Sequence, residues 1–169
     1  PALPPDDAAL VSLLAAAVMA EAAGAACKWP NDLLVGERKV AGLLAEASVE
    51  GGELRHLVVG IGVNVTTAAA DLPRGATSLD IEGLHSTPQA LLGRFLRRFR
   101  AAYRPGERWF AGSVVDAYRE RCATLGRRVR ARTTSGEVIE GTATGVDARG
   151  GLVTDAGTVA FGEIEHLEG

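Results

Sequence analysis

The first long apolar stretch of the chain covers residues 8–20 and is interrupted only by Ser12. Two acidic residues, Asp6 and Asp7, precede it, and Gly24 follows it. An aspartate side chain can cap the start of a helix, and glycine is the residue most often found just past a helix end. A signal peptide would begin with basic residues, and a membrane span would be longer. The pattern therefore predicts a buried helix that begins at Asp6 or Asp7.

Three strand-like stretches follow, and short turns separate them. The stretches cover residues 32–35, 39–48 and 56–65. The turns contain Gly36-Glu37 and Gly51-Gly52. Connections this short join neighbouring antiparallel strands, so an antiparallel meander is expected. Residues 66–86 contain several turn-forming residues and are expected to form a loop.

A second helical region begins at Thr87-Pro88, where threonine can cap the helix and proline fits its first turn. Apolar residues then recur at helical spacing and predict one buried face: Leu91, Leu92, Phe95, Leu96, Phe99 and Ala102. Arginines lie between them and are read as a solvated basic face rather than a nucleic-acid patch: Arg94, Arg97, Arg98, Arg100 and Arg104. Pro105-Gly106 ends this helix, and another is predicted over residues 109–122, with Trp109 and Tyr118 in the core.

The pattern changes again near Leu125-Gly126. From there to the last residue, short β-branched runs alternate with glycine-containing turns, which is typical of a small barrel of about five strands. The predicted fold class is therefore α+β, with helices packed on an antiparallel or mixed sheet. We expect one domain over residues 1–123 and a small β domain over residues 124–169.

Composition and charge narrow the functional classes. Hydrophobic residues make up 47% of the 169 residues and charged residues 23%, as in ordinary soluble globular proteins. The net charge of −3 offers no overall attraction to nucleic acid or to an anionic membrane. Cys27 and Cys122 are too few and too far apart for a disulfide framework or a zinc site, so reduced thiols and a cytoplasmic location are expected.

The stretch most specific for chemistry is Lys28-Trp29-Pro30-Asn31-Asp32, which continues to Lys39-Val40-Ala41-Gly42. Lys39 lies just past a tight turn on an otherwise apolar strand, so the sheet would hold its ammonium in place. A fixed cation suits a reaction in which negative charge builds up on phosphate or carboxylate oxygens. The residues alone equally allow a surface hairpin with solvated Lys and Arg. Trp29 could stack on a ligand, although core packing is the more economical interpretation.

A second feature is the strand Gly60-Ile61-Gly62-Val63-Asn64. Alternating positions of a strand share one face, so two bare Cα atoms and Asn64 would lie together, and a ligand could approach the backbone there. Tight packing of a helix against the glycines explains the same pattern and stays open at this point. The three histidines have no ligand spacing and are read as structural or exposed: His56, His85 and His166.

Together these two features resemble the biotin protein ligases. The signature of that family reads Lys-Trp-Pro-Asn-Asp, then a short strand and turn, then Lys-Leu-Ala-Gly, and a Gly-x-Gly-x-Asn strand follows at a similar distance. The β-rich tail is similar to the SH3-like C-terminal domain of the family. The resemblance implies a catalytic fold like that of class II aminoacyl-tRNA synthetases, and it implies a two-step reaction. Biotin and ATP give biotinyl-5′-AMP, and the biotinyl group then passes to a lysine of a biotin carboxyl carrier protein.

The resemblance also implies roles for individual residues. Lys39 would lie between the biotin carboxylate and the α-phosphate and would be the catalytic residue. The biotin ring system would lie against the backbone at Gly42, Gly60 and Gly62. The residues expected near ATP or the adenylate are Lys28, Asn31, Asp32, Arg38 and Asn64. Asp32 could instead hold Mg²⁺ that arrives with ATP, or serve only the turn, and no metal ligand is assigned.

One part of the family pattern has no counterpart in this sequence, namely the upstream Gly-Arg-Gly-Arg-x-Gly-Arg loop that closes over biotin. We therefore expect the chain, which opens at Pro1, to be part of a longer protein. Two alternatives remain. One is a lipoyl or octanoyl protein ligase or transferase, and the other is a truncated binding or dimerisation module without activity. Oligomeric state, including a homodimer, is left open.

Overall fold

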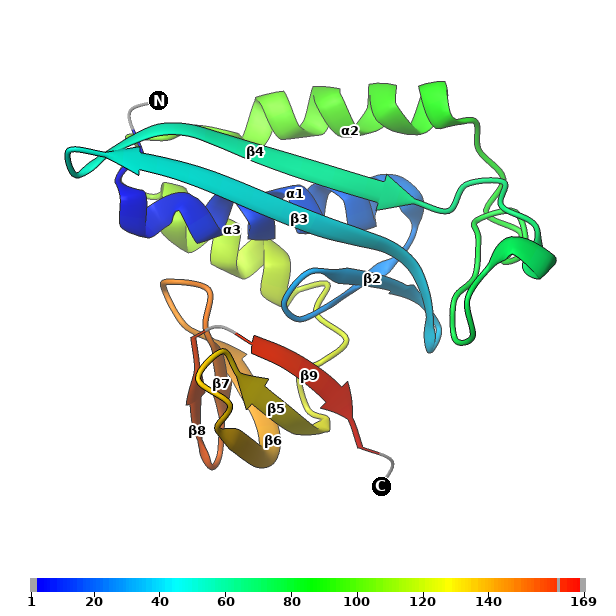
Figure 1. Cartoon of the computed structure of the whole chain (residues 1–169). Coiled ribbons are helices and arrows are strands. Elements are labelled where there is room, and N and C mark those ends of the chain that lie inside the picture. Colours follow the sequence, from blue (N-terminus) through cyan, green and yellow to red (C-terminus); the bar gives the residue numbers. More distant parts are fainter. Residues whose placement is uncertain (1–2, 161, 168–169) are drawn as a thin grey trace.

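The computed structural model describes residues 3–160 and 162–167, which form three α-helices and two antiparallel sheets (Figure 1). A short 3-10 turn, η1 (Pro5–Asp7), leads into α1 (Ala8–Ala23). The first sheet contains β1 (Ala26–Lys28), β2 (Asp32–Val35), β3 (Arg38–Glu50) and β4 (Glu53–Val63). A loop with one further 3-10 turn, η2 (Ala69–Asp71), then leads to α2 (Pro88–Ala102) and α3 (Phe110–Arg119). The α+β fold class predicted from the sequence is confirmed.

Helix α1 is buried along most of its length, as its apolar sequence predicts. Gly24 ends it in the left-handed conformation at φ 70°, where glycine carries no steric cost. Asp7 occupies the N-cap position, but its side chain makes no capping hydrogen bond, so the predicted aspartate cap is wrong for this residue. The Asp6 side chain lies outside the described part of the chain. The helix is therefore stabilised by burial of its apolar side chains and not by a hydrogen bond from the Asp7 side chain.

The first sheet has the strand order β1-β2-β3-β4, and every neighbouring pair is antiparallel. β3 and β4 form a long hairpin in front of α1 (Figure 1). Because side chains alternate across a strand, the face toward α1 carries Leu43 and its partner Ile61. The opposite face carries Gly42, Leu44 and their partners Gly62 and Gly60. The predicted meander is confirmed, and β1, which the sequence pattern did not predict, extends it.

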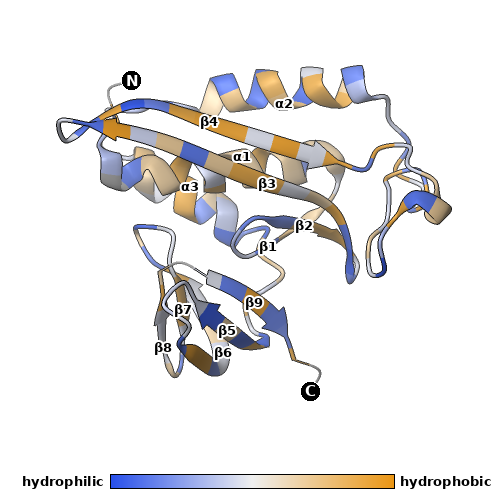
Figure 2. Cartoon of the chain, viewed as in Figure 1, coloured by the Kyte–Doolittle hydropathy of each residue, from blue (hydrophilic) through white to orange (hydrophobic). Residues whose placement is uncertain are grey.

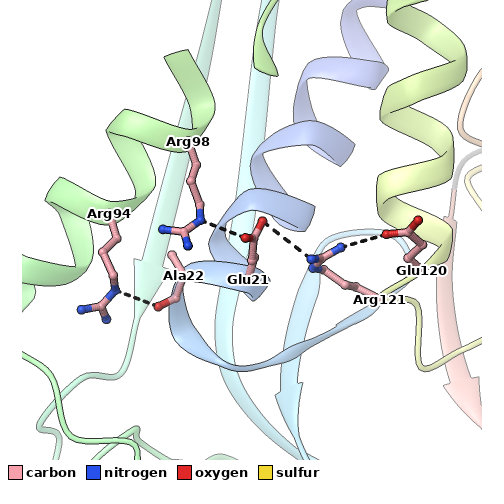
Figure 3. A network of polar contacts seen from close by, with 6 residues as sticks. All are labelled: Glu21, Ala22, Arg94, Arg98, Glu120 and Arg121. Carbon is pink, nitrogen blue, oxygen red and sulfur yellow. Dashed lines mark hydrogen bonds and ion pairs between the residues drawn. The ribbon is translucent and has the colours of Figure 1, made fainter. Parts of the chain in front are cut away.

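Glu21 of α1 joins the two other helices (Figure 3). Its carboxylate lies 3.0 Å from Arg98 Nε of α2 and 3.7 Å from a guanidinium nitrogen of Arg121, just past α3. Arg94 of α2 also donates to the Ala22 carbonyl oxygen at 3.1 Å. The prediction that all five arginines are solvated is therefore wrong for Arg94, which is partly buried and fastens α2 to α1, whereas Arg98 stays exposed while it pairs with Glu21.

Two other predictions about the helices need correction. Thr87 caps α2 as expected, since its Oγ1 accepts a hydrogen bond from the Ala90 N–H. However, only Leu91 and Phe95 of the predicted apolar face are buried, and Leu92 and Leu96 are each 53% exposed. Tyr118 is fully buried as predicted, whereas Trp109 is 54% exposed and so lies outside the core.

The C-terminal sheet contains β5 (Arg128–Thr133), β6 (Val138–Val146), β7 (Leu152–Thr154), β8 (Gly157–Val159) and β9 (Gly162–His166). Its order is β8-β7-β6-β5-β9, and within residues 124–160 and 162–167 no pairing joins the edge strands β8 and β9. The sheet has the predicted five strands, but the runs predicted at residues 138–139 and 142–146 form the single strand β6, and β9 was not predicted. The closed barrel and the boundary at Thr124 stay predictions. No described helix is long and apolar enough to cross a membrane.

Candidate active site

Lys39 is held through its backbone by a loop that is distant in sequence. Its N–H donates to the Gly75 carbonyl at 3.0 Å, and its carbonyl accepts from the Thr77 N–H at 2.8 Å. Residues 75–77 therefore run beside the start of β3 and form a bridge with Lys39. Because both backbone groups are engaged, only the side-chain torsions of Lys39 remain free. The sheet and the loop therefore fix the base of the Lys39 side chain, and the position of its ammonium depends on the contacts of that side chain.

The Lys39 ammonium lies between Asp32 and Gly42. Nζ is 2.5 Å from Asp32 Oδ1, and about half of the Lys39 side chain remains exposed. A methyl group placed on Gly42 would lie 3.3 Å from both Cε and Nζ of Lys39. Such a contact is tighter than ordinary van der Waals packing, so the missing side chain of Gly42 provides the space in which the lysine lies.

A hollow of about 400 Å³ opens beside this ion pair. The first sheet contributes Lys28, Asp32 and Lys39 to its wall, and the loop before residue 77 contributes Arg74. Residues of β9, including His166, form the opposite side, so the hollow lies between the two sheets. Three cationic side chains in one wall suit a polyanionic ligand. Carboxylates in the same wall pair with some of these cations and so limit how many of them can bind the ligand.

The two asparagines of the motifs flank strands of the first sheet, Asn31 in the turn before β2 and Asn64 directly after β4, and each uses its amide group locally. Asn31 donates from Nδ2 to the Leu43 carbonyl at 2.8 Å, and the Leu43 N–H donates back to the Asn31 carbonyl at 2.8 Å. Asn64 donates from Nδ2 to the Thr77 carbonyl at 3.0 Å. Asn64 therefore holds the same loop that pairs with Lys39. In each carboxamide the oxygen remains as the atom that can meet a ligand or its water.

Arg38 is turned away from the hollow although it neighbours Lys39. Its guanidinium lies 2.6 Å from Glu82 Oε1, and the same carboxylate oxygen accepts from Thr77 Oγ1 at 2.5 Å. In the described structure Arg38 thus braces the loop after β4. Its predicted place near ATP stays a prediction, and a change of rotamer would be needed to bring it there.

Gly60 and Gly62 face outward from the sheet, on the side opposite α1. Methyl groups built on them would meet the nearest atoms at 3.7 Å and 3.9 Å, which is ordinary contact distance. The alternative that these glycines allow a helix to pack tightly is therefore wrong. Two large apolar side chains share this face and are exposed, Leu44 by 64% and Val58 by 57%. Figure 2 shows the hydrophobic stretches that run along β3 and β4.

Trp29 connects the signature stretch, Lys28-Trp29-Pro30-Asn31-Asp32, to the C-terminal sheet. It is 2% exposed, and its indole N–H donates to the Gly150 carbonyl at 2.9 Å, so the core-packing interpretation is confirmed. Its backbone N–H donates to Thr124 Oγ1 at 3.1 Å. Cys27 pairs with the chain on either side of Cys122, through bonds of 2.7 Å and 2.8 Å. Both thiols are free and buried, and burial raises the pKa of Cys27 to about 12.

Arg74, Thr77, Thr124 and His166 all contact this region, and none was assigned to it from the sequence. Each of them lies 35 or more positions from Lys39 in the sequence, in a loop or in the C-terminal part of the chain. The only signal was the turn Pro73-Arg74-Gly75 before a polar stretch, which is common in loops. No local pattern reports a contact of this kind.

Two sequence profiles match separate parts of the chain. The profile of the biotin/lipoate A/B protein ligase family covers residues 4–64, which include Lys39 and both glycines. The profile of the biotin protein ligase C-terminal domain covers residues 124–167. The chain belongs to the biotin protein ligase family.

Individual biotin protein ligases agree with this membership. The biotin–[acetyl-CoA-carboxylase] ligase of Mycobacterium tuberculosis is 34% identical over 145 residues, which are 83% of this chain and 52% of that protein. The enzyme of the same name from Paracoccus denitrificans is 34% identical over 160 residues, 86% of this chain and 66% of that protein. The chain therefore spans between half and two thirds of the length of these biotin protein ligases.

The fold agrees as well. A crystal structure of the biotin protein ligase from Aquifex aeolicus superposes with a TM-score of 0.74 at 21% identity. The superposition covers 97% of this chain and 78% of that one. Both sheets of this chain therefore belong to the fold of that structure.

Proposed function

We propose that this chain functions in biotin–protein ligation and forms the Lys39 side of the site at which biotin is activated by ATP. The observation that carries the proposal is the position of the Lys39 ammonium. It lies over Gly42, between the open glycine face of β3 and β4 and the charged hollow beside Asp32. An apolar ring system and a phosphate chain can therefore meet at one fixed cation.

In the first step, a biotin carboxylate oxygen would attack the α-phosphorus of ATP. One P–O bond forms, the bond to the β-phosphate oxygen breaks, and pyrophosphate leaves. Two anions must approach each other for this to happen, and charge accumulates on the phosphorus oxygens. The Lys39 ammonium would reduce the repulsion and stabilise that charge, because a fixed donor needs no reorganisation during the reaction.

Biotin binding is assigned to the outward face of the first sheet. With hydrogen atoms in place of side chains, Gly60 and Gly62 let the biotin ring system approach the backbone, and Leu44 and Val58 offer apolar contact beside it. The ATP phosphates are assigned to the hollow, where Lys28 and Arg74 supplement Lys39. The carboxamide oxygens of Asn31 and Asn64 would accept hydrogen bonds from the ligand or its waters.

Magnesium is expected to arrive with ATP rather than to be held by a protein cage. Within the described residues, no three His, Cys, Asp or Glu side chains are grouped to bind a metal ion. Asp32 is the carboxylate nearest the proposed phosphates, and it already forms an ion pair with Lys39. Mg²⁺ in nucleotide sites commonly uses one or two carboxylates and the phosphates themselves, so Asp32 alone would fit this arrangement.

In the second step, the amine of an acceptor lysine would attack the acyl carbon of biotinyl-5′-AMP, and AMP would leave. The curated relatives are named for acetyl-CoA carboxylase, which supports a biotin carboxyl carrier domain as the acceptor. The lipoyl alternative is less well supported, because residues 124–167 match the C-terminal domain of biotin protein ligases specifically. A homodimer and a cytoplasmic location are further parts of the proposal.

The proposal is tested by binding of a stable analogue of biotinyl-5′-AMP in which a sulfamate replaces the phosphate. The ¹⁵N-labelled chain would be titrated with the analogue and followed by NMR, which also measures weak binding. We expect the amide signals of Lys39, Gly42, Gly60 and Gly62 to shift together. Lys39→Met should lose this response, because the methionine side chain has similar length but no charge.

Arg55→Met is the matched control, because Arg55 is a cation on β4 of the same sheet and pairs only with Glu50 and Glu53. It should bind as the unchanged chain does. Equal losses in both variants, or shifts confined to another surface, would contradict the assignment of the site.

A further inference from the structure

Thr124 lies at the point where the second sheet contacts the signature stretch. It is fully buried, and its Oγ1 accepts the backbone N–H of Trp29 at 3.1 Å. The same oxygen lies 3.0 Å from Nε2 of His166, on the edge strand β9. A buried backbone N–H that loses its acceptor is destabilising, so this hydroxyl strongly determines where residue 29 lies.

Trp29 is followed directly in the chain by residues of the proposed site, so its position affects theirs. Pro30 follows directly, and its carbonyl accepts from the Tyr118 hydroxyl at 3.4 Å. Asn31 comes next and is bound to Leu43 of β3 through its backbone and its side chain. Asp32 then forms the ion pair with Lys39. A displacement at residue 29 would therefore change the placement of the Asn31 carboxamide and of the Asp32 carboxylate.

The surroundings of His166 favour its neutral form, which carries no positive charge beside the Thr124 hydroxyl. Burial lowers the pKa of His166, and the cations Lys28 and Arg127 lower it further, while Glu37 opposes them. The imidazole is therefore neutral at pH 7. Arg127 is itself held by a bidentate ion pair with Glu37, at 2.8 Å and 2.6 Å. Thr124 thus sits between a neutral imidazole and the Trp29 amide, both of which are fixed.

We propose that Thr124 is a positioning residue of the activation site, through which the C-terminal sheet orients Asn31 and the Asp32–Lys39 pair. Thr124 touches neither biotin nor ATP in this proposal and acts through Trp29. The inference rests on the proposed function for its effect on ligand binding, but its effect on Asn31 is independent of any ligand.

The test compares Thr124→Val, Thr124→Ser and Val159→Ala in the full 169-residue chain. Valine has nearly the shape of threonine and lacks the hydroxyl, whereas serine keeps it. Val159 is fully buried on β8, the edge of the C-terminal sheet opposite β9, so its truncation destabilises that sheet and leaves the Thr124 hydroxyl in place. For each variant we would measure the melting temperature, the NMR signals of the Asn31 side-chain amide, and the Kd of the sulfamate analogue.

Thr124→Val should raise the Kd about tenfold and shift the Asn31 signals, because small displacements of binding groups have effects of this order or larger. Thr124→Ser should restore both quantities to within about twofold of the original. Val159→Ala should lower the melting temperature and leave both unchanged. A similar loss of affinity in Val159→Ala, or an unchanged Kd in Thr124→Val, would show that Thr124 contributes only to stability.

If the unchanged chain does not bind the analogue, the proposed function fails, and the inference is still decided in the ligand-free protein. Thr124→Val should then speed hydrogen exchange at the Trp29 amide and shift the Asn31 side-chain signals. Unchanged exchange and unchanged signals would overturn the inference. Should Thr124→Val not fold, Thr124→Ala, which also removes the hydroxyl and adds no bulk, takes its place in both measurements.

Discussion

At the scale of single residues, the site depends on a lysine whose backbone and side chain are both held. Lys39 pairs with residues 75–77 through its backbone, and its ammonium pairs with Asp32. Lys39→Ala should therefore leave the fold intact while removing the cation that we propose stabilises the transition state. In the chain extended by the glycine- and arginine-rich loop of the family, we expect adenylation to fall by about 10²–10³-fold. Pyrophosphate release against biotin concentration measures this, and a near-normal rate would remove Lys39 from the mechanism.

Gly42 gives a second test at this scale, because its missing side chain makes room for Lys39. The methyl group of Gly42→Ala would lie 3.3 Å from Nζ and would push the ammonium away from Asp32. We expect a Kd for the sulfamate analogue about tenfold higher, with the melting temperature within a few degrees of the original. Gly112→Ala, on the exposed side of α3 where an added methyl group meets no atom within 4 Å, is a control for glycine replacement remote from Lys39. A Gly42→Ala variant that binds normally would mean that the lysine has other places to lie.

The sequence predicted the residues that lie within the two motifs, and it failed for those that come from elsewhere. Lys39, Asp32 and Gly42 could be identified because one hairpin brings them together over a few positions. Thr124 and His166 could not, because the contact between the two sheets depends on how complete surfaces pack. Arg38 shows the same limit of sequence-based prediction for a residue that lies inside the motif. Its neighbour in sequence is Lys39, but its partner in space is Glu82.

At the scale of elements, the hairpin of β3 and β4 has one face against α1 and one open face. The alternation of side chains predicted this division, but not which face the glycines would occupy. Helix α2 shows where periodicity fails. Leu92 and Leu96 have the spacing of a buried face and are nevertheless half-exposed, because α1 covers only the stripe that contains Leu91 and Phe95.

The open face leads to a prediction about β4. Gly60→Ala and Gly62→Ala add a methyl group where the nearest atoms are 3.7 Å or more away, so neither variant is strained. Glycine within a strand costs roughly 0.5–1 kcal/mol relative to alanine, so the melting temperature should stay the same or rise slightly. The sulfamate analogue should nevertheless bind at least about tenfold more weakly, because the methyl group keeps the ring system off the backbone. Thermal unfolding and NMR titration measure the two effects, and unfolded variants with normal affinity would contradict the geometry.

At the scale of the whole molecule, the junction of the two sheets should be sensitive to pH through His166. Burial and the nearby cations lower the pKa of His166 in the folded chain, so the unfolded chain binds more protons at mildly acidic pH. The stabilisation is complete above the unfolded pKa of about 6.5 and is lost as pH falls through the folded value. Melting temperatures at pH 7.5 and pH 5.0 should therefore differ more in the original chain than in His166→Gln. His56→Gln, which alters an exposed histidine on β4, should keep the original difference. Equal pH dependence in all three proteins would remove His166 as the sensitive group.

The openness of the site determines what the 169-residue chain can do by itself. Biotinyl-5′-AMP is a reactive mixed anhydride, and a ligase must shield it from water until the acceptor lysine arrives. In this chain the glycine face is exposed, and Leu44 and Val58 beside it are uncovered. We therefore expect the chain alone to bind biotin weakly and to label a carrier domain below detection in the presence of ATP and Mg²⁺. The same chain fused to an upstream segment with the glycine- and arginine-rich loop should label it, and Lys39→Ala in that fusion should not. Avidin detection of the carrier measures the outcome, and strong labelling by the chain alone would show that β3, β4 and the charged hollow suffice to retain the adenylate.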